Sequence, residues 1–446
     1  MSKIAKSFWG GLAGLSVLWL LVNPDVLAGQ PNFIAWRNVL VQYSGVLGMG
    51  VMSVAMLLAM RPLWLEPKLG GLDKVYRLHK WLGIAGLILS VSHWLLAKGP
   101  KWLSQLGLLQ GGRPRGPRPA ALNDGSLQAL FQQLRHTAES MGEWAFYAAA
   151  ALMVLALIKA VPYRWFSKLH RALPVAYLVL AFHSVVLLRF DNWLSPLGVV
   201  MTLLLAGGTV SAILSLLGKR AGRPAAMASI SALDYQQSQQ VLTVELQFEG
   251  NWPGHRAGQF AFITFDEKEG AHPFTLASAW RGDGKARVMI KALGDYTASL
   301  PALLKLGDAV KVEGPYGRFT FEGKTRRQIW ISGGIGVTPF LARMQALVAG
   351  DKPHRVDFFH AMRDADESVI ARLRKTAAGA GVKLHLFSQA QGQRLDAAQL
   401  QQLAPDWREA DFWFCGPAGF GQQLKQALVA QGLPADRFHQ ELFMMR

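Results

Sequence analysis

The chain has 446 residues, of which 51% are hydrophobic, and it contains a single cysteine, Cys415. One cysteine excludes an intrachain disulfide, a cysteine-held iron–sulfur cluster and c-type haem attachment. The net charge of +18 is uneven, because residues 1–224 hold 22 Lys and Arg against 7 Asp and Glu, whereas residues 225–446 hold 25 against 22. The basic excess therefore belongs to the apolar half, as the positive-inside rule expects of a membrane protein, and we find no nucleic-acid footprint.

Six apolar stretches predict six membrane-spanning helices, because each approaches the length of about 20 residues that a bilayer requires. The first follows a basic start like that of a signal peptide, but no convincing cleavage site precedes Asn23-Pro24, so we interpret it as an uncleaved helix from about Phe8. The other spans cover about residues 39–60, 79–97, 144–161, 169–188 and 194–217.

Basic residues in the connecting loops predict that both termini are cytoplasmic. The long connection over residues 98–143 weakens this charge asymmetry, and its role is not evident from the sequence. Its last part, about residues 127–144, has a helical pattern, and we expect that helix to lie on the membrane face.

Two of the predicted spans carry two histidines each. His79 and His93 are fourteen residues apart, which places them about 21 Å apart on nearly one face of a helix. His170 and His183 would lie on rather different faces of an ideal helix, but Pro174 gives a reason for irregular geometry there. A lone histidine in an apolar helix is more often a hydrogen-bonded core residue or a proton relay. Four at paired spacings could hold two stacked bis-histidine haems.

The second half of the chain has the pattern of two domains outside the membrane. Residues 226–321 contain short alternating runs separated by Gly, Pro and Asp, which predict an antiparallel β-barrel. From residue 328 onward, apolar strands alternate with helical patterns, which indicates a parallel α/β sheet. We therefore predict three domains, over residues 1–218, 219–321 and 322–446.

A glycine-rich turn follows the first strand of the predicted α/β domain. Gly333, Gly334 and Gly336 would permit the backbone to approach a pyrophosphate at a helix N-terminus, although such a turn is at least as often only a tight turn. Thr338 can cap this helix, and Pro339 fits its first turn. Later strands place four further residues at the carboxyl edge of the sheet, where ligands bind in such folds: Ser388, Cys415, Gly416 and Pro417.

These features occur together with further motifs in an order that resembles the NADPH oxidase and ferric reductase superfamily, across nearly the full length of the chain. In order, the motifs are GGLDKVYRLHKWLG with its paired histidines, HPFT, KALGDYTASL, GPYG, GGIGVTPF and CGP. The resemblance implies a bacterial-type transmembrane flavocytochrome b. Its fold would be a six-helix di-haem bundle followed by a ferredoxin-reductase-like module, with an antiparallel β-barrel that binds FAD and a parallel α/β domain that binds NAD(P)H.

The resemblance also implies roles for individual residues. The axial ligands of two b-type haems would be His79 with His170 on the cytoplasmic side and His93 with His183 on the outer side. The residues beside the flavin ring and ribityl chain of FAD would be His272, Pro273, Phe274 and Thr275. The residues at the FAD pyrophosphate would be Lys291, Gly294 and Thr297.

The NADPH or NADH that donates electrons would meet a further set of residues. Its phosphates would bind at Gly333, Gly334, Gly336, Thr338 and Pro339, with Ser388 at the same edge. Near the nicotinamide would lie Cys415, Gly416 and Pro417. Phe443 resembles the C-terminal aromatic residue that covers the flavin face, and with Cys415 it is a candidate for catalysis. Arg363 and Arg394 are candidates for an adenosine 2′-phosphate, and the alternative is that they are solvated loop arginines.

The resemblance implies an oxidoreductase in a bacterial-type inner (plasma) membrane, which passes electrons from NAD(P)H through FAD and two haems to an acceptor on the opposite side. Oxygen, giving superoxide, or ferric iron is the expected acceptor. Two alternatives stay open: transfer to quinone or another membrane protein, and a histidine-lined proton channel or sensor with a nucleotide-binding module. The expected partners are NAD(P)H, a small-molecule acceptor and the lipid bilayer, and the sequence shows no sign of an obligatory protein partner.

Overall fold

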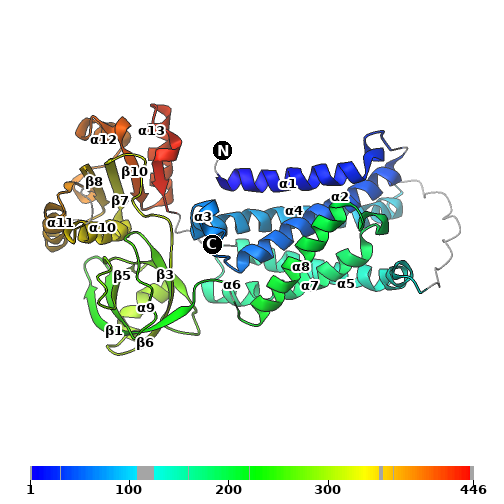
Figure 1. Ribbon diagram of the computed structural model, residues 1–446, viewed down its shortest axis with the longest axis horizontal. Coiled ribbons are helices and arrows are strands. Elements are labelled where there is room, and N and C mark those ends of the chain that lie inside the picture. Colours follow the sequence, from blue (N-terminus) through cyan, green and yellow to red (C-terminus); the bar gives the residue numbers. More distant parts are fainter. Residues whose placement is uncertain are drawn as a thin grey trace. The chain divides into compact units, whose positions relative to one another are not determined.

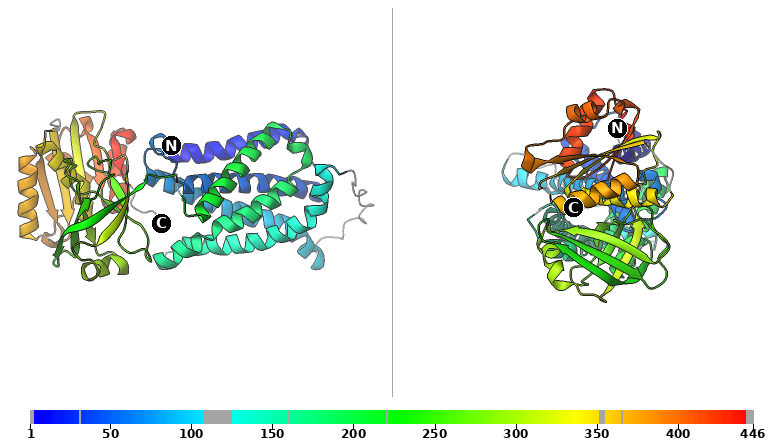
Figure 2. Two further views of the ribbon diagram at one scale, coloured as in Figure 1. Left: turned by 60° about the horizontal axis from the view of Figure 1, so that its bottom comes forward. Right: turned by 90° about the vertical axis from the view of Figure 1, so that its left-hand side faces the viewer.

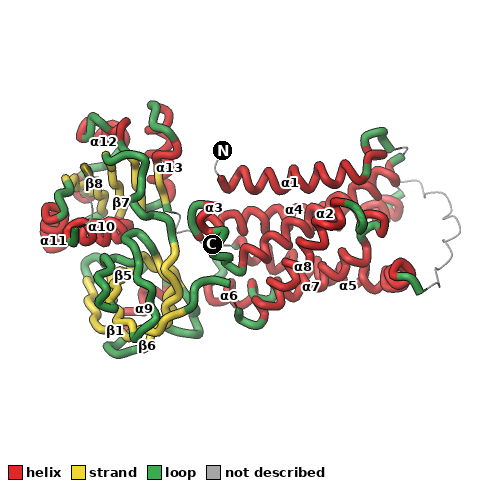
Figure 3. The backbone as a smooth tube through the Cα atoms, in the orientation of Figure 1, coloured by secondary structure: helices red, strands yellow, loops and turns green. Residues whose placement is uncertain are grey.

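We describe residues 3–30, 32–107, 125–158, 160–219, 221–350, 355–364 and 366–441 in a computed structural model of the chain. The chain divides into two compact units, with the boundary between Gly222 and Arg223. Helices make up the first unit, and strands with helices make up the second (Figure 3).

The first unit is a bundle in which six helical segments are long and apolar enough to cross a membrane (Figure 1). They are α1 (Lys3–Val22), α2 (Phe33–Ala59), α4 (Leu72–Gln105), α5 (Leu127–Leu157), α6 with α7 (Tyr163–His170 and Leu173–Leu187) and α8 (Pro196–Leu216), and a short α3 (Glu66–Leu69) precedes α4. Helix α2 packs against α4 and α8, while α5 packs against α7, and Figure 2 shows these helices side by side. The prediction of six spans is confirmed, although α1 begins at Lys3 rather than near Phe8.

Helices α4 and α5 are longer than the sequence pattern indicates. They contain 34 and 31 residues, which corresponds to about 51 and 46 Å at 1.5 Å per residue, against about 30 Å of hydrocarbon. The prediction of a separate helix on the membrane face near residues 127–144 is wrong, because this segment is the first half of α5. The Ser126 side chain caps α5 by accepting a hydrogen bond from the Ala129 N–H, so the polar first turns are stabilised as part of one continuous helix.

The irregular geometry expected after His170 is confirmed. Helix α6 ends at His170 and α7 begins at Leu173, with Pro174 in the first turn of α7. Proline has no N–H to donate, and it is tolerated in the first turn, where that N–H would have no intrahelical partner. Because the helix is interrupted between His170 and His183, the angle between their side chains need not be that of an ideal continuous helix.

The second unit begins with an antiparallel barrel. Its strands are β1 (Ala225–Gln236), β2 (Val241–Phe248), β3 (Phe260–Thr264), β4 (His272–Thr275), β5 (Lys285–Lys291) and β6 (Ala309–Tyr316), with α9 (Asp295–Leu303) between the last two. The order is β4-β3-β6-β1-β2-β5, and a bridge between Leu276 and Val288 joins the two edges. Inward side chains such as Val244, Ile263 and Val312 are fully buried, so their alternation with exposed residues specifies the barrel.

A parallel sheet follows the barrel. Its strands are β7 (Arg327–Gly333), β8 (Arg355–Met362), β9 (Lys383–Ser388), β10 (Asp411–Cys415) and β11 (Phe438–Gln440), and its helices are α10 (Thr338–Val348), α11 (Glu367–Gly379), α12 (Ala397–Leu403) and α13 (Ala418–Ala430). The order is β11-β10-β7-β8-β9. Because the chain proceeds from β7 to one side and returns to the other side with β10, the direction of winding reverses between β7 and β10. Ligands bind in such sheets beyond the carboxyl ends of the strands at this point.

Candidate functional site

The four predicted haem-ligand histidines lie in two pairs. The ring centroids are 6.0 Å apart for His79 and His170 and 6.3 Å apart for His93 and His183. A metal lies about 2 Å from a ligating imidazole nitrogen, and that nitrogen lies about 1 Å from the centre of its ring. Two imidazoles on opposite sides of one metal therefore have ring centroids about 6 Å apart. Both pairs therefore have the separation that axial ligation of one iron requires. We call them the inner pair (His79 and His170) and the outer pair (His93 and His183).

Hydrogen bonds orient three of these rings. The Nδ1 atoms of His79, His93 and His183 lie 2.9, 3.0 and 2.8 Å from the carbonyl oxygens of Ala55, Val41 and Ala138. A carbonyl can only accept, so each Nδ1 carries the proton and each Nε2 keeps its lone pair for a metal. The Nδ1 of His170 is buried and has no hydrogen-bond partner within the described ranges. The donor set fits two bis-histidine haems.

Two glycines that sequence reasoning missed make room for the outer pair. A Cβ at Gly45 of α2 would lie 3.3 Å from Cε1 of His93, and one at Gly142 of α5 would overlap Nδ1 of His183. Only glycine therefore leaves space for the His183 ring in its present position. No periodicity marks these glycines, and the available signal was their presence inside apolar helices, where glycine is unfavourable unless a close approach requires it.

We expect Gly142→Ala to displace His183 and to lower the content of the outer haem, because the added methyl group occupies the position of the ring. Alanine is a better helix former than glycine by about 1 kcal/mol, so helix weakening would not explain such a loss. The control is Gly83→Ala on α4, since a Cβ at Gly83 meets nothing within 4 Å. Haem content per chain and low-temperature absorption spectra measure the effect, and two normal haems in Gly142→Ala would contradict it.

The two predicted FAD motifs lie together in the barrel unit. Strand β4 consists of His272, Pro273, Phe274 and Thr275, and the His272 ring stacks on Tyr296 of α9 with centroids 4.6 Å apart. Burial lowers the pKa of His272, so the ring is neutral at physiological pH. Burial, with the charges of Asp266 and Glu269, raises the pKa of Tyr296 to about 12. The pair offers a neutral aromatic surface next to the turn that precedes α9.

That turn contains the predicted pyrophosphate positions. Lys291 is the last residue of β5 and Gly294 precedes the first turn of α9. The Thr297 hydroxyl accepts hydrogen bonds from the N–H groups of Leu293 and Gly294 at 3.0 and 3.2 Å. Thr297 thus fixes the turn between β5 and α9. This turn has the positively charged Lys291 at its start and the N-terminus of α9 at its end. A helix N-terminus with a neighbouring cation is a suitable site for phosphate.

The glycine-rich turn after β7 interlocks with the loop after β10. A Cβ at Gly333 would lie 2.7 Å from Cδ of Pro417, and one at Gly416 would lie 2.8 Å from the Gly333 nitrogen. Gly336 lies against the Cys415 carbonyl, where a Cβ would overlap the oxygen. These three glycines are needed for packing between the two loops. Gly334 has φ of +56° and open space before it, so its backbone remains accessible to a ligand.

The expected capping role of Thr338 is wrong. Val337 occupies the N-cap position of α10, and the Thr338 hydroxyl donates to the Ile335 carbonyl at 3.2 Å instead of accepting from the helix. Pro339 does lie in the first turn, as predicted. The first turn of α10 therefore has no side-chain cap. Its N–H groups have no intrahelical acceptor, and they come directly after the turn that contains Gly334.

The remaining nucleotide candidates differ in exposure. Cys415 is buried, which with the Glu441 charge raises the pKa of its thiol well above the usual value, so it is a neutral thiol rather than a nucleophile. The Ser388 hydroxyl is buried without a hydrogen-bond partner in the described part of the chain. Arg363 and Arg394 are exposed, on loops that are joined by a 3.0 Å hydrogen bond from Ala390 N–H to the Arg363 carbonyl. Phe443 lies outside the described residues.

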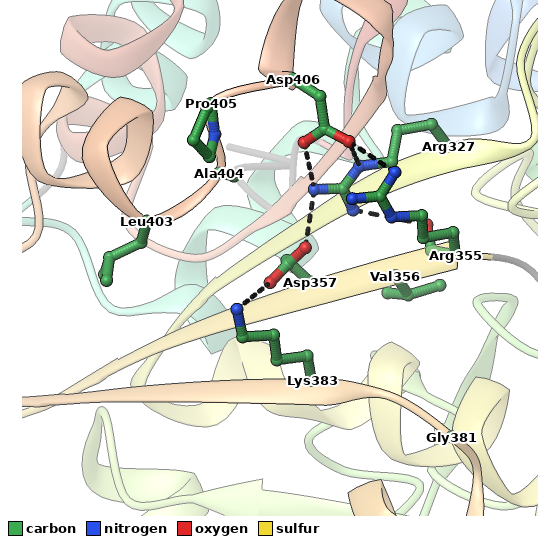
Figure 4. Close-up of a pocket in the computed structure, with 10 residues that line it drawn as sticks. All are labelled: Arg327, Arg355, Val356, Asp357, Gly381, Lys383, Leu403, Ala404, Pro405 and Asp406. Carbon is green, nitrogen blue, oxygen red and sulfur yellow. Dashed lines mark hydrogen bonds and ion pairs between the residues drawn. The ribbon is translucent and has the colours of Figure 1, made fainter.

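Sequence reasoning also missed two polar groups in the sheet. His360 of β8 and the Ser332 hydroxyl are 2.7 Å apart and buried beside the glycine-rich turn, and burial lowers the pKa of His360 to about 4. A hollow of about 260 Å³ lies at the opposite edge, where β7, β8 and β9 begin (Figure 4). There the buried Arg327 contacts Asp357 and Asp406. This hollow is therefore separate from the predicted nucleotide site.

Three family descriptions match successive parts of the chain. Residues 44–181 match the ferric reductase like transmembrane component, residues 225–320 a FAD-binding domain and residues 330–426 an oxidoreductase NAD-binding domain. An NADPH oxidoreductase from Mycobacterium tuberculosis is 33% identical over 38% of this chain and 47% of that protein. A flavohemoprotein from Halalkalibacterium halodurans is 30% identical over 31% of this chain and 37% of that protein.

Among solved structures, the FAD/NAD binding domain of a nitric oxide dioxygenase from Vibrio cholerae aligns with a TM-score of 0.43 and 23% identity. That alignment covers 49% of this chain and 98% of the dioxygenase domain. The matched segment spans about half the length of the Mycobacterium tuberculosis relative and less of the Halalkalibacterium halodurans relative.

Proposed function

Because the chain has the three-domain architecture of the NADPH oxidase and ferric reductase superfamily, we propose that it is an oxidoreductase which moves electrons from NAD(P)H across a membrane. Its cofactors are FAD and two b-type haems, with NADPH or NADH as the donor. When bound, FAD accepts a hydride and releases single electrons, and haem iron carries single electrons. The observation that carries the proposal is the pair of histidine separations, 6.0 and 6.3 Å, at two levels of one apolar bundle.

Each residue group has a defined part in this proposal. The inner and outer pairs would hold the iron atoms of the two haems. Backbone carbonyls accept from Nδ1 of three of the four rings and so leave Nε2 of each with its lone pair for a metal. The buried side chains of the bundle keep water away from the path between the pairs. The turn before α9 binds the FAD pyrophosphate, and the turn around Gly334 binds the nucleotide phosphates. Cys415 and Pro417 would lie beside the nicotinamide.

Three further parts of the proposal concern selectivity and location. Arg363 and Arg394 contact the 2′-phosphate of the adenosine ribose, and Ser388 lies at the same edge of the sheet. The protein is a multi-pass protein of a bacterial inner membrane, with both termini in the cytoplasm. The acceptor is a small molecule on the opposite side. Oxygen, which would give superoxide, and ferric iron are the first candidates, and a quinone is the alternative.

Anaerobic reduction by NADPH tests the proposal. Purified protein reconstituted with FAD is expected to contain two haems per chain and to show reduced haem spectra after NADPH is added. Oxygen, Fe(III) citrate or a quinone is then mixed in, and the acceptor that reoxidises the haem fastest identifies the physiological class. A chain without haem, or haem that NADPH leaves oxidised in the presence of FAD, would contradict the proposal.

A further inference from the structure

Helix α4 contains a proline, Pro100, at an interior position. Proline has no N–H, so the carbonyl four residues earlier, that of Leu96, loses the donor that a regular helix would give it. A backbone carbonyl away from water needs a hydrogen-bond partner, and in membrane proteins a neighbouring helix often supplies the replacement. The Leu96 carbonyl is therefore an acceptor for another helix of the bundle.

Arg37 of α2 is that partner. Its Nε donates to the Leu96 carbonyl at 2.9 Å, and its Nη2 donates to the next carbonyl, that of Ala97, at 2.8 Å. A guanidinium holds its N–H groups in a fixed fork, so one side chain can meet two successive carbonyls. An arginine near the end of a span can also extend toward water, but Arg37 is partly buried and points across to α4. Its hydrogen bonds thus compensate for the N–H that Pro100 lacks.

The contact made by Arg37 lies one helical turn from the bond that orients His93. Arg37 and Val41 are four residues apart on α2, and His93 and Ala97 are four residues apart on α4. The Val41 carbonyl accepts from His93 Nδ1 at 3.0 Å. Because four residues span about 6 Å of helix, the two cross-links lie on successive turns of the same pair of helices.

The His93 ring has little room to move. A Cβ at Gly45 would lie 3.3 Å from its Cε1, and the Ser44 hydroxyl lies 3.2 Å from its Nδ1. Its centroid is 6.3 Å from that of His183, the separation that one iron requires. A shift or rotation of α4 would change all three distances, because they start from one side chain attached to that helix. Arg37 can therefore act on His93 through α4 without touching it.

We propose that Arg37 and Pro100 form a clamp that sets the position of α4 and so holds His93 as a ligand of the outer haem. The inference rests on the proposed function and assigns a positioning residue to it. Pro100 makes the Leu96 carbonyl available and Arg37 binds it, so the two residues have this role only together.

The charge of Arg37 is the alternative explanation for any effect on the outer haem. Its Nη1 donates to the neutral Asn38 side chain at 3.0 Å, and no carboxylate among the described residues forms an ion pair with it. A positive charge near haem iron would favour the reduced state. The clamp and the charge predict different results when Pro100 is also replaced.

Arg37→Met in the full-length protein in nanodiscs removes both hydrogen bonds. Electron paramagnetic resonance of the oxidised protein reports the angle between the imidazole planes of a low-spin haem, and we expect the outer-haem signal to shift. Transfer of the outer haem to apomyoglobin is expected to become about tenfold faster, because leaving a buried carbonyl unpaired costs a factor of this order. The inner-haem signal should stay unchanged.

Pro100→Ala tests the clamp by rescue. Alanine restores an N–H for the Leu96 carbonyl, so Arg37→Met combined with Pro100→Ala is expected to regain the wild-type outer-haem signal and transfer rate. Pro100→Ala alone should also leave both unchanged. The matched control is Arg189→Met, since Arg189 follows α7 and donates to the Asn23 side chain instead of a backbone carbonyl. This variant should behave as the wild type.

Two results would overturn the clamp. One is a normal outer haem in Arg37→Met. The other is a double variant that remains as defective as Arg37→Met, and a normal Arg37→Lys beside it would assign the effect to the charge. Reduction of the inner haem by NADPH, followed in the same samples, shows whether the proposed function stands when the clamp fails.

Discussion

Replacing His79 or His170 by alanine is expected to remove the inner haem, and replacing His93 or His183 the outer one. A low-spin bis-imidazole iron requires both axial ligands, so each single variant should keep one haem per chain and lose electron transfer to the far side. Haem content and reduced-minus-oxidised spectra of the purified variants measure this result.

The control for these variants is His136→Ala. His136 is exposed on α5, two residues from the Ala138 carbonyl that orients His183, and it faces no other described histidine at ligand distance. Two haems with normal spectra are expected in this variant. If any one of the four ligand variants also keeps two haems with unchanged spectra, that histidine is not a ligand.

Arg327→Ala is expected to destabilise the second unit by about 3 kcal/mol, because it removes the guanidinium that pairs with the buried Asp357 carboxylate and with Asp406, and His385 and Arg355 compensate these charges only in part. The Arg327 Nη2 atom lies 2.6 Å from Asp357 and 2.9 Å from Asp406, and the side chains of Arg327 and Asp357 are less than 10% exposed (Figure 4). Urea unfolding of segment 223–446 measures the free energy. Arg355→Ala is the control, since Arg355 is 77% exposed and pairs with the same Asp406, and such pairs contribute about 0–1 kcal/mol.

The same ion pairs predict how the stability of the second unit changes with pH. Burial alone would raise the pKa of Asp357, but the hydrogen bond from His385 and the Arg327 charge hold it below the usual value. Hydrogen bonds from Arg327 lower the pKa of Asp406. A lowered carboxyl pKa stabilises the fold above about pH 4 and loses that contribution as pH falls. Wild-type stability should therefore fall between about pH 5 and 2 more than that of Arg327→Ala, and parallel curves would contradict this.

The paired histidines could be found from sequence because helical periodicity relates fixed spacings to faces of a helix. His79 and His93 followed this rule directly. His170 and His183 would lie on different faces of an ideal helix. The break between α6 and α7, before Pro174, explains how His170 can still face His79 while His183 faces His93. The sheet and barrel were likewise predictable, because alternating and continuous apolar runs differ in period.

Other features depend on contacts that sequence patterns do not encode. The room for His183 comes from Gly142 on another helix, and the need for glycine at Gly336 comes from the Cys415 carbonyl. The segment before Trp144 reads as a polar surface helix because Arg135 and Glu139 interrupt its apolar pattern, although they pair with each other at 3.0 Å. Strand β1, rich in alanine and serine, has low intrinsic β-propensity and is recognised only by its pairing with β2 and β6.

Electron transfer across a sealed membrane tests the central claim most directly. The protein is reconstituted into liposomes that contain ferricyanide, and NADPH, which cannot cross the bilayer, is added only outside. Molecules whose second unit faces outward are expected to reduce the enclosed ferricyanide, and His93→Ala or His183→Ala should abolish that reduction. Enclosed ferricyanide that stays oxidised while the protein reduces an external dye with NADPH would contradict transmembrane transfer.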